Sequence, residues 1–401
     1  MTSSHGNSRP LGNTHRNVGL LSACQALLMT NNSTLIAVNG LAGLALAPSA
    51  SLATLPVTCW VVGGAVATMS ASQYMRKVGR RAGLIRGAAI GIVGALICAA
   101  ATWQGSFWLL CFGALVFGAF NAFGQYYRFV ATEVSSPAFR ATAVSLVLAG
   151  GLVGGIVGPT TSRITVDLIG PRFTGAYLAL IAFVLVTMAL LTRIRIPELS
   201  AAEQAGSGRP MAEIAKQPKY VVAVLYGALS YGVMNFLMTS TPIAMGVCGH
   251  PYGDAAMVIS SHVVAMFAPS FITGGLIKRL GTIPVMLVGA ALNVVCIGVA
   301  LAGVAVANFW WALVLLGVGW NFLYIGATTL LTETYRPEER AKAQGVNEFT
   351  VFAMMAVSSF SSGMIVTNAG WEKVNYAAAP LIAVVILALV FLSMTTKKGR
   401  T

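Results

Sequence analysis

Charge is scarce in this 401-residue chain: only 9% of the residues are Asp, Glu, Lys or Arg, whereas 57% are hydrophobic. A soluble domain carries about 25% charged residues, so this chain lacks the polar surface that a protein needs in water. Its apolar residues gather in segments of roughly 20 residues, the length that spans a bilayer. The composition therefore excludes a soluble globular protein and predicts a polytopic membrane protein.

Motifs for catalysis, metal binding and nucleotide binding are also missing. The six cysteines lie mostly within apolar segments and show no metal-ligand spacing, so neither a disulfide framework nor a metal site is expected. No nucleotide-binding loop or catalytic-triad spacing occurs, and there is no long soluble domain of the kind that a membrane sensor carries. We therefore expect no enzyme, no cofactor and no metal site.

Twelve apolar segments follow a polar start, which lacks the short apolar core and cleavage site of a cleavable signal peptide. The predicted spans are 17–40, 49–72, 83–103, 107–131, 142–166, 174–194, 219–243, 255–277, 283–305, 309–331, 345–367 and 375–395. A polar segment divides the first six from the last six. The predicted organisation is a tail, a six-helix bundle, a linker, a second six-helix bundle and a tail: 1–16, 17–195, 196–218, 219–395 and 396–401.

Positive charge is distributed unevenly between the two sides of the predicted membrane protein. With both termini in the cytosol, 22 of the 25 Lys and Arg residues fall on the inner side, and only Arg163, Arg172 and Lys373 fall outside. The positive-inside rule accepts this orientation and rejects its inverse. Loops that face anionic lipid explain the net charge of +14 better than nucleic acid does. We expect a multi-pass protein of the bacterial inner membrane with cytosolic termini.

Two loops of the sequence repeat one another. The stretches EVSSPAFRATAVS (133–145) and ETYRPEERAKAQG (333–345) share Glu, Pro, Arg and Ala at the same spacing, and each follows the fourth predicted helix of a half. After the second helix of each half, Gly79 and Gly281 follow a basic residue at the same interval. A duplicated six-helix unit around a site at the membrane midplane is a transporter architecture.

This organisation resembles the major facilitator superfamily over about residues 17–395. The resemblance implies an all-α integral membrane protein with twelve transmembrane helices in two pseudo-symmetric six-helix bundles, usually a monomer. The family signature after the second helix reads G-x-x-x-D-R-x-G-R-[RK]. Here Ser72 stands at the first Gly and Arg76 at the Asp, and Lys278 replaces the Asp in the second half. Both halves therefore lack the acidic residue that helps to latch the inner gate in the family.

Ion pairs of the repeated loops could replace that acid at the inner gate. A carboxylate and a guanidinium group pair well, and the candidate pairs are Glu133 with Arg140 and Glu333 with Arg340. The alternative is routine interfacial pairing that only orders two loop ends. The predicted gating residues are Gly79, Arg80, Glu133, Arg140, Gly281, Glu333 and Arg340.

Polar side chains inside the apolar spans are costly in lipid and tend to face a cavity. The resemblance implies a cavity lined by helices 1, 4, 7 and 10, and here these helices carry most of the amides, together with aromatic rings. Such a lining suits a flat, largely neutral molecule. The predicted substrate-binding residues are Asn31, Asn121, Tyr127, Arg128, Asn235, Thr239, His262, Trp320, Asn321 and Tyr324.

Several of these residues also have a structural interpretation. Asn31 and Asn121 could join helices, as amides in membranes often do, and the aromatic rings could serve packing. Arg128 either marks a pathway or extends to the interface. His262 either relays protons or makes an internal hydrogen bond.

Carboxylates are few, and their positions bear on the driving force. None of the eleven acidic residues lies in the middle of helices 1, 4, 7 or 10, where proton-coupled members of the family usually carry one. Glu348, near the inner end of the eleventh predicted helix, either binds a proton or pairs with a basic residue such as Lys342 at the inner rim. Facilitated diffusion and coupling through Glu348 or His262 are both compatible with the sequence.

Two stretches bear on the substrate: SSHVVAMFAPSFITGGLIKRLG (260–281) and VGWNFLYIGATTLL (318–331) are similar to a bacterial branch of the family associated with riboflavin uptake. Amide and hydroxyl groups can bond the uracil-like edge and ribityl chain of a flavin, although other planar heterocycles fit equally well. The leading hypothesis is alternating-access import of such a molecule, with membrane lipid as the other partner. The alternative is a proton-coupled exporter, because AGGLVGGIVGPTTSR (149–163) resembles the drug-antiporter signature.

Overall fold

The computed structural model describes residues 13–49, 52, 55–196 and 208–398, and these residues contain helices and turns but no β-strand. The helices of the first half are α1 (Thr14–Leu46), α2 (Leu55–Val78), α3 (Arg80–Gln104), α4 (Phe107–Gly124), α5 (Tyr127–Glu133), η3 (Pro137–Phe139), α6 (Arg140–Thr165) and α7 (Thr174–Arg193). Those that follow are α9 (Met211–Ala215), α10 (Pro218–Val247), α11 (Tyr252–Phe267), α12 (Ser270–Leu280), α13 (Thr282–Leu301), α14 (Val306–Leu331), η4 (Pro337–Glu339) and α15 (Arg340–Lys398).

Ten stretches of the described chain are long and apolar enough to cross a membrane, whereas the sequence predicts twelve spans. Two features account for the difference. The last stretch, Pro337–Phe391, contains two predicted spans, because Gly370 (φ 81°, ψ 177°) interrupts the helical geometry inside α15. The first predicted span lies in α1, which is not among the ten because side chains such as Gln25, Asn31 and Asn32 make it more polar.

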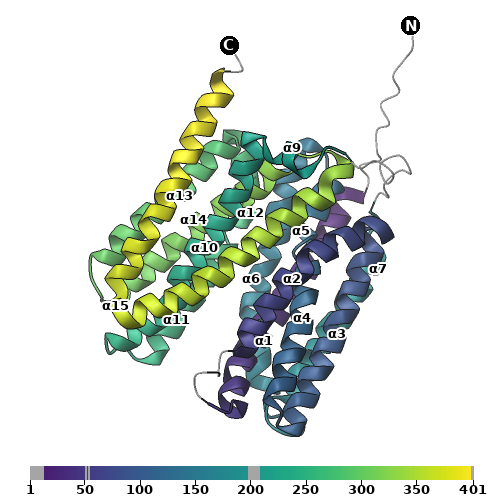
Figure 1. Ribbon diagram of the computed structural model, residues 1–401, viewed down its shortest axis with the longest axis vertical. Coiled ribbons are helices and arrows are strands. Elements are labelled where there is room, and N and C mark those ends of the chain that lie inside the picture. The colour runs from purple at the N-terminus through teal and green to yellow at the C-terminus, as the bar shows by residue number, and fades with distance from the viewer. Residues whose placement is uncertain (1–12, 50–51, 53–54, 197–207, 399–401) are drawn as a thin grey trace.

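The helices form two groups that lie side by side, α1 to α7 in one and α10 to α15 in the other (Figure 1). In the first group α1 packs along α6, and α4 contacts α2 and α3; in the second, α10 packs along α15 and α13 along α14. The groups meet where α2 packs on α15 and where α6 packs on α11 and α12. Small residues permit close contacts between helices. Within the first group, for example, a Cβ on Gly154 of α6 would lie 2.5 Å from the backbone nitrogen of Thr30 on α1.

Two predicted spans are each divided by a short break. The span 107–131 is interrupted at Gln125, and the span 255–277 at Pro269, which lacks an N–H group to continue the helix. Backbone groups freed at membrane depth need partners. Arg128 donates to the carbonyl of Gln125 at 3.2 Å, and Asn321 donates to the carbonyl of Met266 at 2.6 Å. Polar side chains therefore support both breaks.

The turns after the second helix of each half have nearly the same backbone conformation. Gly79 has φ 87° and ψ 151°, and Gly281 has φ 90° and ψ 160°. This region of backbone space is essentially restricted to glycine. The repeat that is visible in the sequence is thus a repeat of backbone geometry as well.

Parts of the predicted tails and linker fall outside the described residues, namely 1–12, 197–207 and 399–401. Within the described part, α1 begins at Thr14, inside the predicted N-terminal tail, and α15 continues to Lys398, inside the predicted C-terminal tail. The short helix α9 lies in the second part of the predicted linker.

Candidate substrate cavity and its closed end

A cavity of about 370 Å³ lies between the two groups of helices. Its walls come from α1, α2, α4 and α6 on one side and from α10, α11, α14 and α15 on the other. The polar and aromatic lining residues include Asn32, Ser33, Trp60, Asn121, Gln125, Tyr231, Asn235, Thr239, Tyr324, Glu348 and Ser359. Small-molecule sites have volumes of about 300–1,000 Å³ and a few well-placed polar groups in an apolar wall, and this cavity has that character.

Amide side chains bond to one another along the first-half wall. Asn32 on α1 donates its Nδ2 to Oδ1 of Asn121 on α4 at 2.8 Å, and Nε2 of Gln125 donates to the same oxygen at 3.2 Å. On the opposite wall, Asn235 donates to the carbonyl of Met355 at 3.1 Å and to the hydroxyl of Ser358 at 3.0 Å. These bonds fix the orientation of the amides that face the cavity.

A buried ion pair between the two halves lies at one end of the cavity. Nη2 of Arg128 on α5 donates to Oε1 of Glu348 on α15, and the two side chains are only 2% and 1% exposed. Arg128 also donates to the side-chain oxygen of Gln125 at 3.1 Å, and Asn347 donates to Glu348 at 2.7 Å. Arg128 therefore does not extend to the interface, and Glu348 pairs with it rather than with Lys342.

Three aromatic rings of the second half pack beside this pair. Trp320 and Tyr324 stack with centroids 5.0 Å apart and planes 18° apart, and Tyr231 meets both edge-on at 5.2 and 4.9 Å. The guanidinium carbon of Arg128 lies 4.6 Å from the centroid of Tyr324, which is within the range of a cation–π contact. Tyr231 and Tyr324 line the cavity, whereas Trp320 is buried next to them and does not.

The structure brings together half of the ten residues that the sequence predicts to bind substrate. Four line the cavity: Asn121, Asn235, Thr239 and Tyr324. Arg128 contacts the lining residue Glu348. Five lie outside the lining: Asn31, Tyr127, His262, Trp320 and Asn321.

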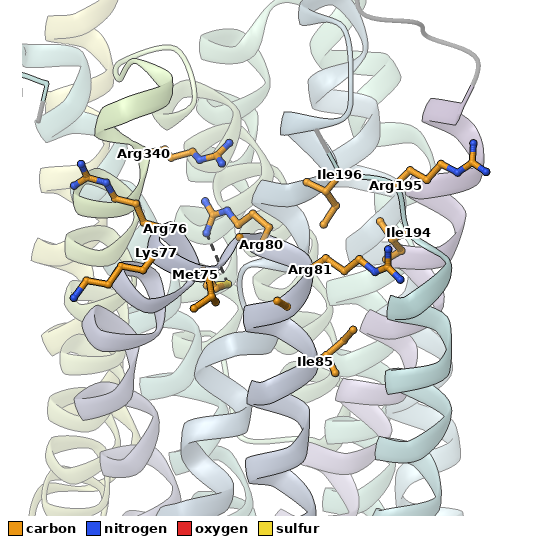
Figure 2. Close-up of a pocket in the computed structure, with 13 residues that line it drawn as sticks. Met75, Arg76, Lys77, Arg80, Arg81, Ile85, Ile194, Arg195, Ile196 and Arg340 are labelled. Carbon is orange, nitrogen blue, oxygen red and sulfur yellow. Dashed lines mark hydrogen bonds between the residues drawn. The ribbon is translucent and has the colours of Figure 1, made fainter. Parts of the chain in front are cut away.

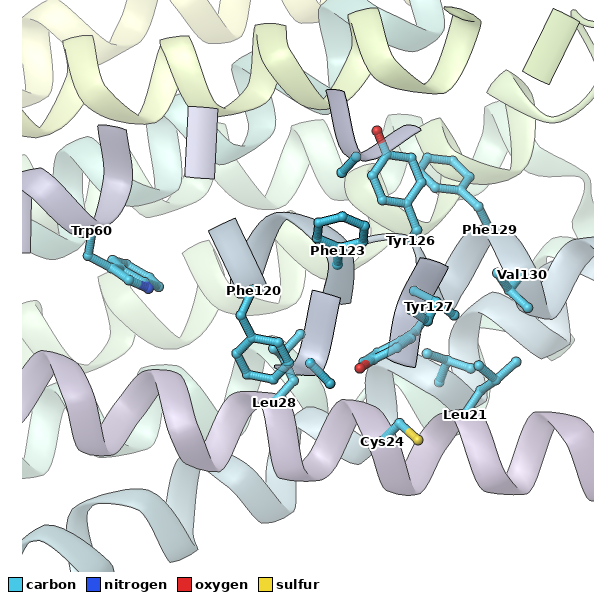
Figure 3. Packing of buried hydrophobic residues seen from close by; sticks show 14 of the residues in the cluster. Leu21, Cys24, Leu28, Trp60, Phe120, Phe123, Tyr126, Tyr127, Phe129 and Val130 are labelled. Atoms are coloured by element: carbon cyan, nitrogen blue, oxygen red, sulfur yellow. The ribbon is translucent and has the colours of Figure 1, made fainter. Parts of the chain in front are cut away.

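Two of the five, Asn31 and Tyr127, belong to the first half. Successive residues of an α-helix point about 100° apart, and on this turn of α1 the lining contains Asn32 and Ser33 but not Asn31. Asn31 is fully buried and its amide has no hydrogen-bond partner in the described chain. Tyr127 packs in the apolar cluster that includes Cys24 and Leu28 (Figure 3).

His262 and Asn321 instead join helices of the second half. Nδ1 of His262 lies 2.7 Å from the carbonyl oxygen of Leu313, which ties α11 to α14. Asn321 also donates to the hydroxyl of Ser270 at 2.6 Å and accepts from the hydroxyl of Thr273 at 2.6 Å. Asn321 thus bonds to both sides of the break between α11 and α12.

Gln125 and Tyr231 were not among the predicted site residues, although helical spacing carries a signal for each. Gln125 follows Asn121 by four residues, and Tyr231 precedes Asn235 by four. Residues four apart lie on the same face of a helix. Extending the predicted polar face by one turn in each direction would have found both.

Ion pairs join the two halves at the end of the molecule that carries Arg80 and Arg340, which we call the basic end. Arg80 at the start of α3 donates to both carboxylate oxygens of Glu133, at 2.7 and 3.2 Å, and Arg340 of the second half lies 3.0 Å from Glu133. The hydroxyl of Ser72 on α2 donates to the carbonyl of Ala341 on α15 at 2.7 Å. One carboxylate therefore holds an arginine from each half.

The partners at the basic end differ from the predicted ones. Glu133 pairs with Arg80 and Arg340 rather than with Arg140, and Glu333 pairs with Lys219. The reason is helix packing: Arg340 is the first residue of α15, and α15 packs on α2 of the first half. The repeated loops thus contribute to a contact between the halves.

The sequence matches the family model of the Major Facilitator Superfamily over residues 21–347 and 253–401. It is 39% identical over 378 residues to the riboflavin transporter RfnT of Brucella anthropi, which covers 94% of this chain and 95% of that protein. It is also 31% identical over 362 residues to the uncharacterized MFS-type transporter YddS of Bacillus subtilis, which covers 86% of this chain and 83% of that protein.

Solved structures of transporters share the fold. The fucose:proton symporter FucP of E. coli superposes with a TM-score of 0.74 at 17% identity and covers 94% of this chain and 99% of that one. A bacterial homologue of the iron transporter ferroportin, in an outward-facing state, superposes with a TM-score of 0.75 at 12% identity and covers 94% and 100%. The all-α membrane fold that the sequence predicts is confirmed.

Proposed function

Because the chain belongs to the major facilitator superfamily, we propose that it imports riboflavin, or a closely related flavin, by alternating access. The protein is a membrane transporter and not an enzyme. The observation that carries the proposed substrate is the 39% identity to a riboflavin transporter across 94% of the chain. The chemistry of the cavity supports the same substrate class.

Four buried polar atoms of cavity-lining residues have no hydrogen-bond partner in the described chain: Asn32 Oδ1, Trp60 Nε1, Tyr324 Oη and Glu348 Oε2. An unsatisfied buried polar group costs about 1–3 kcal/mol, so a ligand that pairs with these atoms gains free energy. Asn32 Oδ1 and the carboxylate oxygen of Glu348 can only accept a hydrogen bond, whereas Trp60 Nε1 can only donate one. A flavin offers both donors and acceptors, namely an imide N–H, ring carbonyls and ribityl hydroxyls.

The aromatic lining suits a flat ring system. Tyr231 and Tyr324 present two rings at right angles, with an interplanar angle of 77°, so a planar ligand can stack on one and meet the edge of the other. Stacking of a base on an aromatic side chain contributes about 1–3 kcal/mol. The fixed amides Asn121 and Asn235 then orient the ligand from opposite walls.

Release of the ligand at the basic end requires the contacts between the halves to separate. These contacts are the pair of Arg128 with Glu348 and the cluster of Arg80, Glu133 and Arg340. Protonation of Glu348 would weaken its pair with Arg128, and we therefore include coupling through Glu348 in the proposal. His262 bonds a backbone carbonyl and does not line the cavity, which favours Glu348 over His262.

Orientation and assembly belong to the same proposal. The basic end faces the cytosol of a bacterial cell, both termini lie on that side of the inner membrane, and the transporter works as a monomer. The uneven distribution of Lys and Arg supports this orientation.

Uptake of radiolabelled riboflavin tests the proposal in bacterial cells that can neither make nor import it. With this protein present, we expect saturable uptake that unlabelled flavins inhibit more strongly than other planar heterocycles do. Asn121→Ala and Tyr324→Phe each remove one polar contact and should raise the apparent KM about tenfold. A proton uncoupler should abolish accumulation against a gradient.

Asn368→Ala is the matched control. Among the described residues its amide bonds only the carbonyl of Met364 in its own helix, at 2.8 Å, and it lies outside the described cavity lining, so uptake should be unchanged. Absence of uptake from protein that reaches the membrane would remove riboflavin as the imported substrate. Loss of label from preloaded cells would favour the exporter instead.

A further inference from the structure

A second cavity, of about 590 Å³, lies at the basic end, and none of its described lining residues lines the substrate cavity. It is formed by the end of α2, the start of α3, the residues after α7 and the start of α15 (Figure 2). Six of the described lining residues are basic and none is acidic: Arg76, Lys77, Arg80, Arg81, Arg195 and Arg340. In the described lining of the substrate cavity, by contrast, the one charged residue is Glu348.

Carboxylates of the described chain neutralise only part of this charge. Glu133 pairs with Arg80 and Arg340 but is not part of the lining. No described carboxylate lies within 4.0 Å of the side-chain nitrogens of Lys77, Arg81 or Arg195. A hollow lined by one sign of charge raises the local concentration of ions of the other sign.

Arg76 adds to the positive charge of this hollow. It occupies the position at which the family signature carries Asp, so the sign of the charge is reversed there. An aspartate at this position would balance the surrounding guanidinium groups from within the chain. With Arg76 in its place, the described lining carries six basic residues and no acidic one.

The first turn of α3 adds a second source of positive potential. Gly79, Arg80, Arg81 and Ala82 all line the cavity, and no side chain caps this 25-residue helix. The first N–H groups of a helix lack intrahelical partners, and together with the helix dipole they favour phosphate groups. The basic side chains and the backbone therefore favour the same ligand.

We propose that this cavity binds a phosphate group, carried by the headgroup of an acidic phospholipid or by a soluble phosphate. The bound group joins the α2–α3 turn of the first half to Arg340 of the second half. Because these elements have to separate before the basic end can open, phosphate stabilises the state in which this end is closed. The site is independent of the transported substrate.

Thermal unfolding of the purified full-length protein tests this site without any transport measurement. In detergent, sodium phosphate should raise the unfolding midpoint by several degrees over sodium chloride at the same ionic strength, because a ligand of the folded state stabilises it. In nanodiscs, phosphatidylglycerol should raise it over phosphatidylcholine. An effect of both identifies the phosphate group itself as the ligand, and an effect of only one identifies its source.

Two variants and a control connect the effect to the cavity. Arg81→Gln should weaken the apparent affinity for the effective phosphate source about tenfold, because a charge-assisted hydrogen bond is lost. Arg76→Asp restores an internal counter-charge and should abolish the response. Arg279→Gln, at the corresponding turn of the second half and outside this cavity, should respond as the original protein does.

Three results would overturn the proposal. One is the absence of any effect of either phosphate source on the original protein. Another is an Arg81→Gln variant that responds with the affinity of Arg279→Gln. The third is a folded Arg76→Asp variant with an unchanged response; should Arg76→Asp not fold, Lys77→Gln replaces it, with the same weakening expected as for Arg81→Gln.

Discussion

Asn121 and Asn321 occupy matching positions in the two halves, yet they bond to different parts of the protein. Asn121 faces the cavity and accepts from Asn32 on α1, whereas Asn321 lies outside the lining and bonds both sides of a helix break. The repeated loops differ in the same way. Glu133 holds two arginines at 11% exposure, whereas Glu333 pairs with one lysine at 43% exposure.

The difference shows which properties the duplicated unit retains. The backbone turn at Gly79 and Gly281 is nearly the same in both halves, because it joins corresponding helices, α2 to α3 and α12 to α13. The buried ion pair between the halves, in contrast, is made once in the described chain: Thr328 stands where the first half has Arg128, so the pair of Arg128 with Glu348 has no counterpart. To the ion-paired clusters the first half contributes Arg80, Arg128 and Glu133, and the second half contributes Arg340 and Glu348. The second half also supplies the packed rings of Tyr231 and Tyr324 in the cavity wall.

The largest effect is expected from breaking the buried ion pair between Arg128 of the first half and Glu348 of the second. Glu348→Gln leaves Arg128 buried without its counter-charge and should lower the free energy of unfolding by about 3–5 kcal/mol, with loss of uptake. The double variant Arg128→Gln with Glu348→Gln should recover much of the stability but not the transport. Denaturation in detergent measures the cycle; strictly additive losses would contradict the pairing.

Glu133 and Glu333 should differ in how much their ion pairs contribute to stability. Glu133→Gln leaves two arginines facing each other and should cost about 3 kcal/mol, whereas Glu333→Gln removes an exposed pair and should cost less than about 1 kcal/mol. Glu133→Gln should also loosen the basic end, so hydrogen exchange should accelerate in the first turns of α15. Equal effects of the two substitutions would show that the halves contribute alike to the gate.

Asn321 and Asn121 should separate stability from transport. Asn321→Ala removes three hydrogen bonds at a helix break and should lower stability by about 2–3 kcal/mol, with an unchanged KM for the protein that remains folded. Asn121→Ala should raise KM at a smaller cost in stability. Unfolding midpoints and uptake kinetics, measured on the same preparations, test this separation. A raised KM for Asn321→Ala would contradict it and would mean that Asn321 contributes to the cavity.

The smallest effects should come where the halves agree. Gly79→Ala and Gly281→Ala each force a side chain into a glycine-only conformation and should cost about 1–2 kcal/mol. Space does not add to the cost at Gly79, because a Cβ there meets no atom within 4 Å, and at Gly281 the nearest atom is 3.7 Å away. The unfolding midpoints of the two variants should fall by the same amount. A clear difference would mean that the two turns contribute differently to stability.

Much of the fold follows from local properties of the sequence. Span length, the glycine turns and the repeated loops are set by residues close in sequence, so the twelve predicted spans and the family resemblance could be read directly. The break at Pro269 also has a local signal. The break at Gln125 has no proline, and its support by Arg128 becomes visible only once α15 places Glu348 beside that arginine.

The site was predicted only as far as helix faces could be assigned. Asn121, Asn235 and Thr239 lie on faces that periodicity identifies, and they line the cavity. Asn31 was selected over its neighbour Asn32 because composition does not fix the rotation of a helix about its axis. Pairs between the halves, such as Glu133 with Arg340, depend on how two bundles pack, and no sequence interval encodes that.

The seven-residue helix α5 carries two contacts at once. Arg128 near its start meets Glu348, and Glu133 at its end meets Arg340; the two are about 7.5 Å apart along the helix axis. Because the segment is short and rigid, a movement that breaks one of these contacts also weakens the other. We therefore expect the basic end to open in a single all-or-none event, and an intermediate that leaks small ions should be rare.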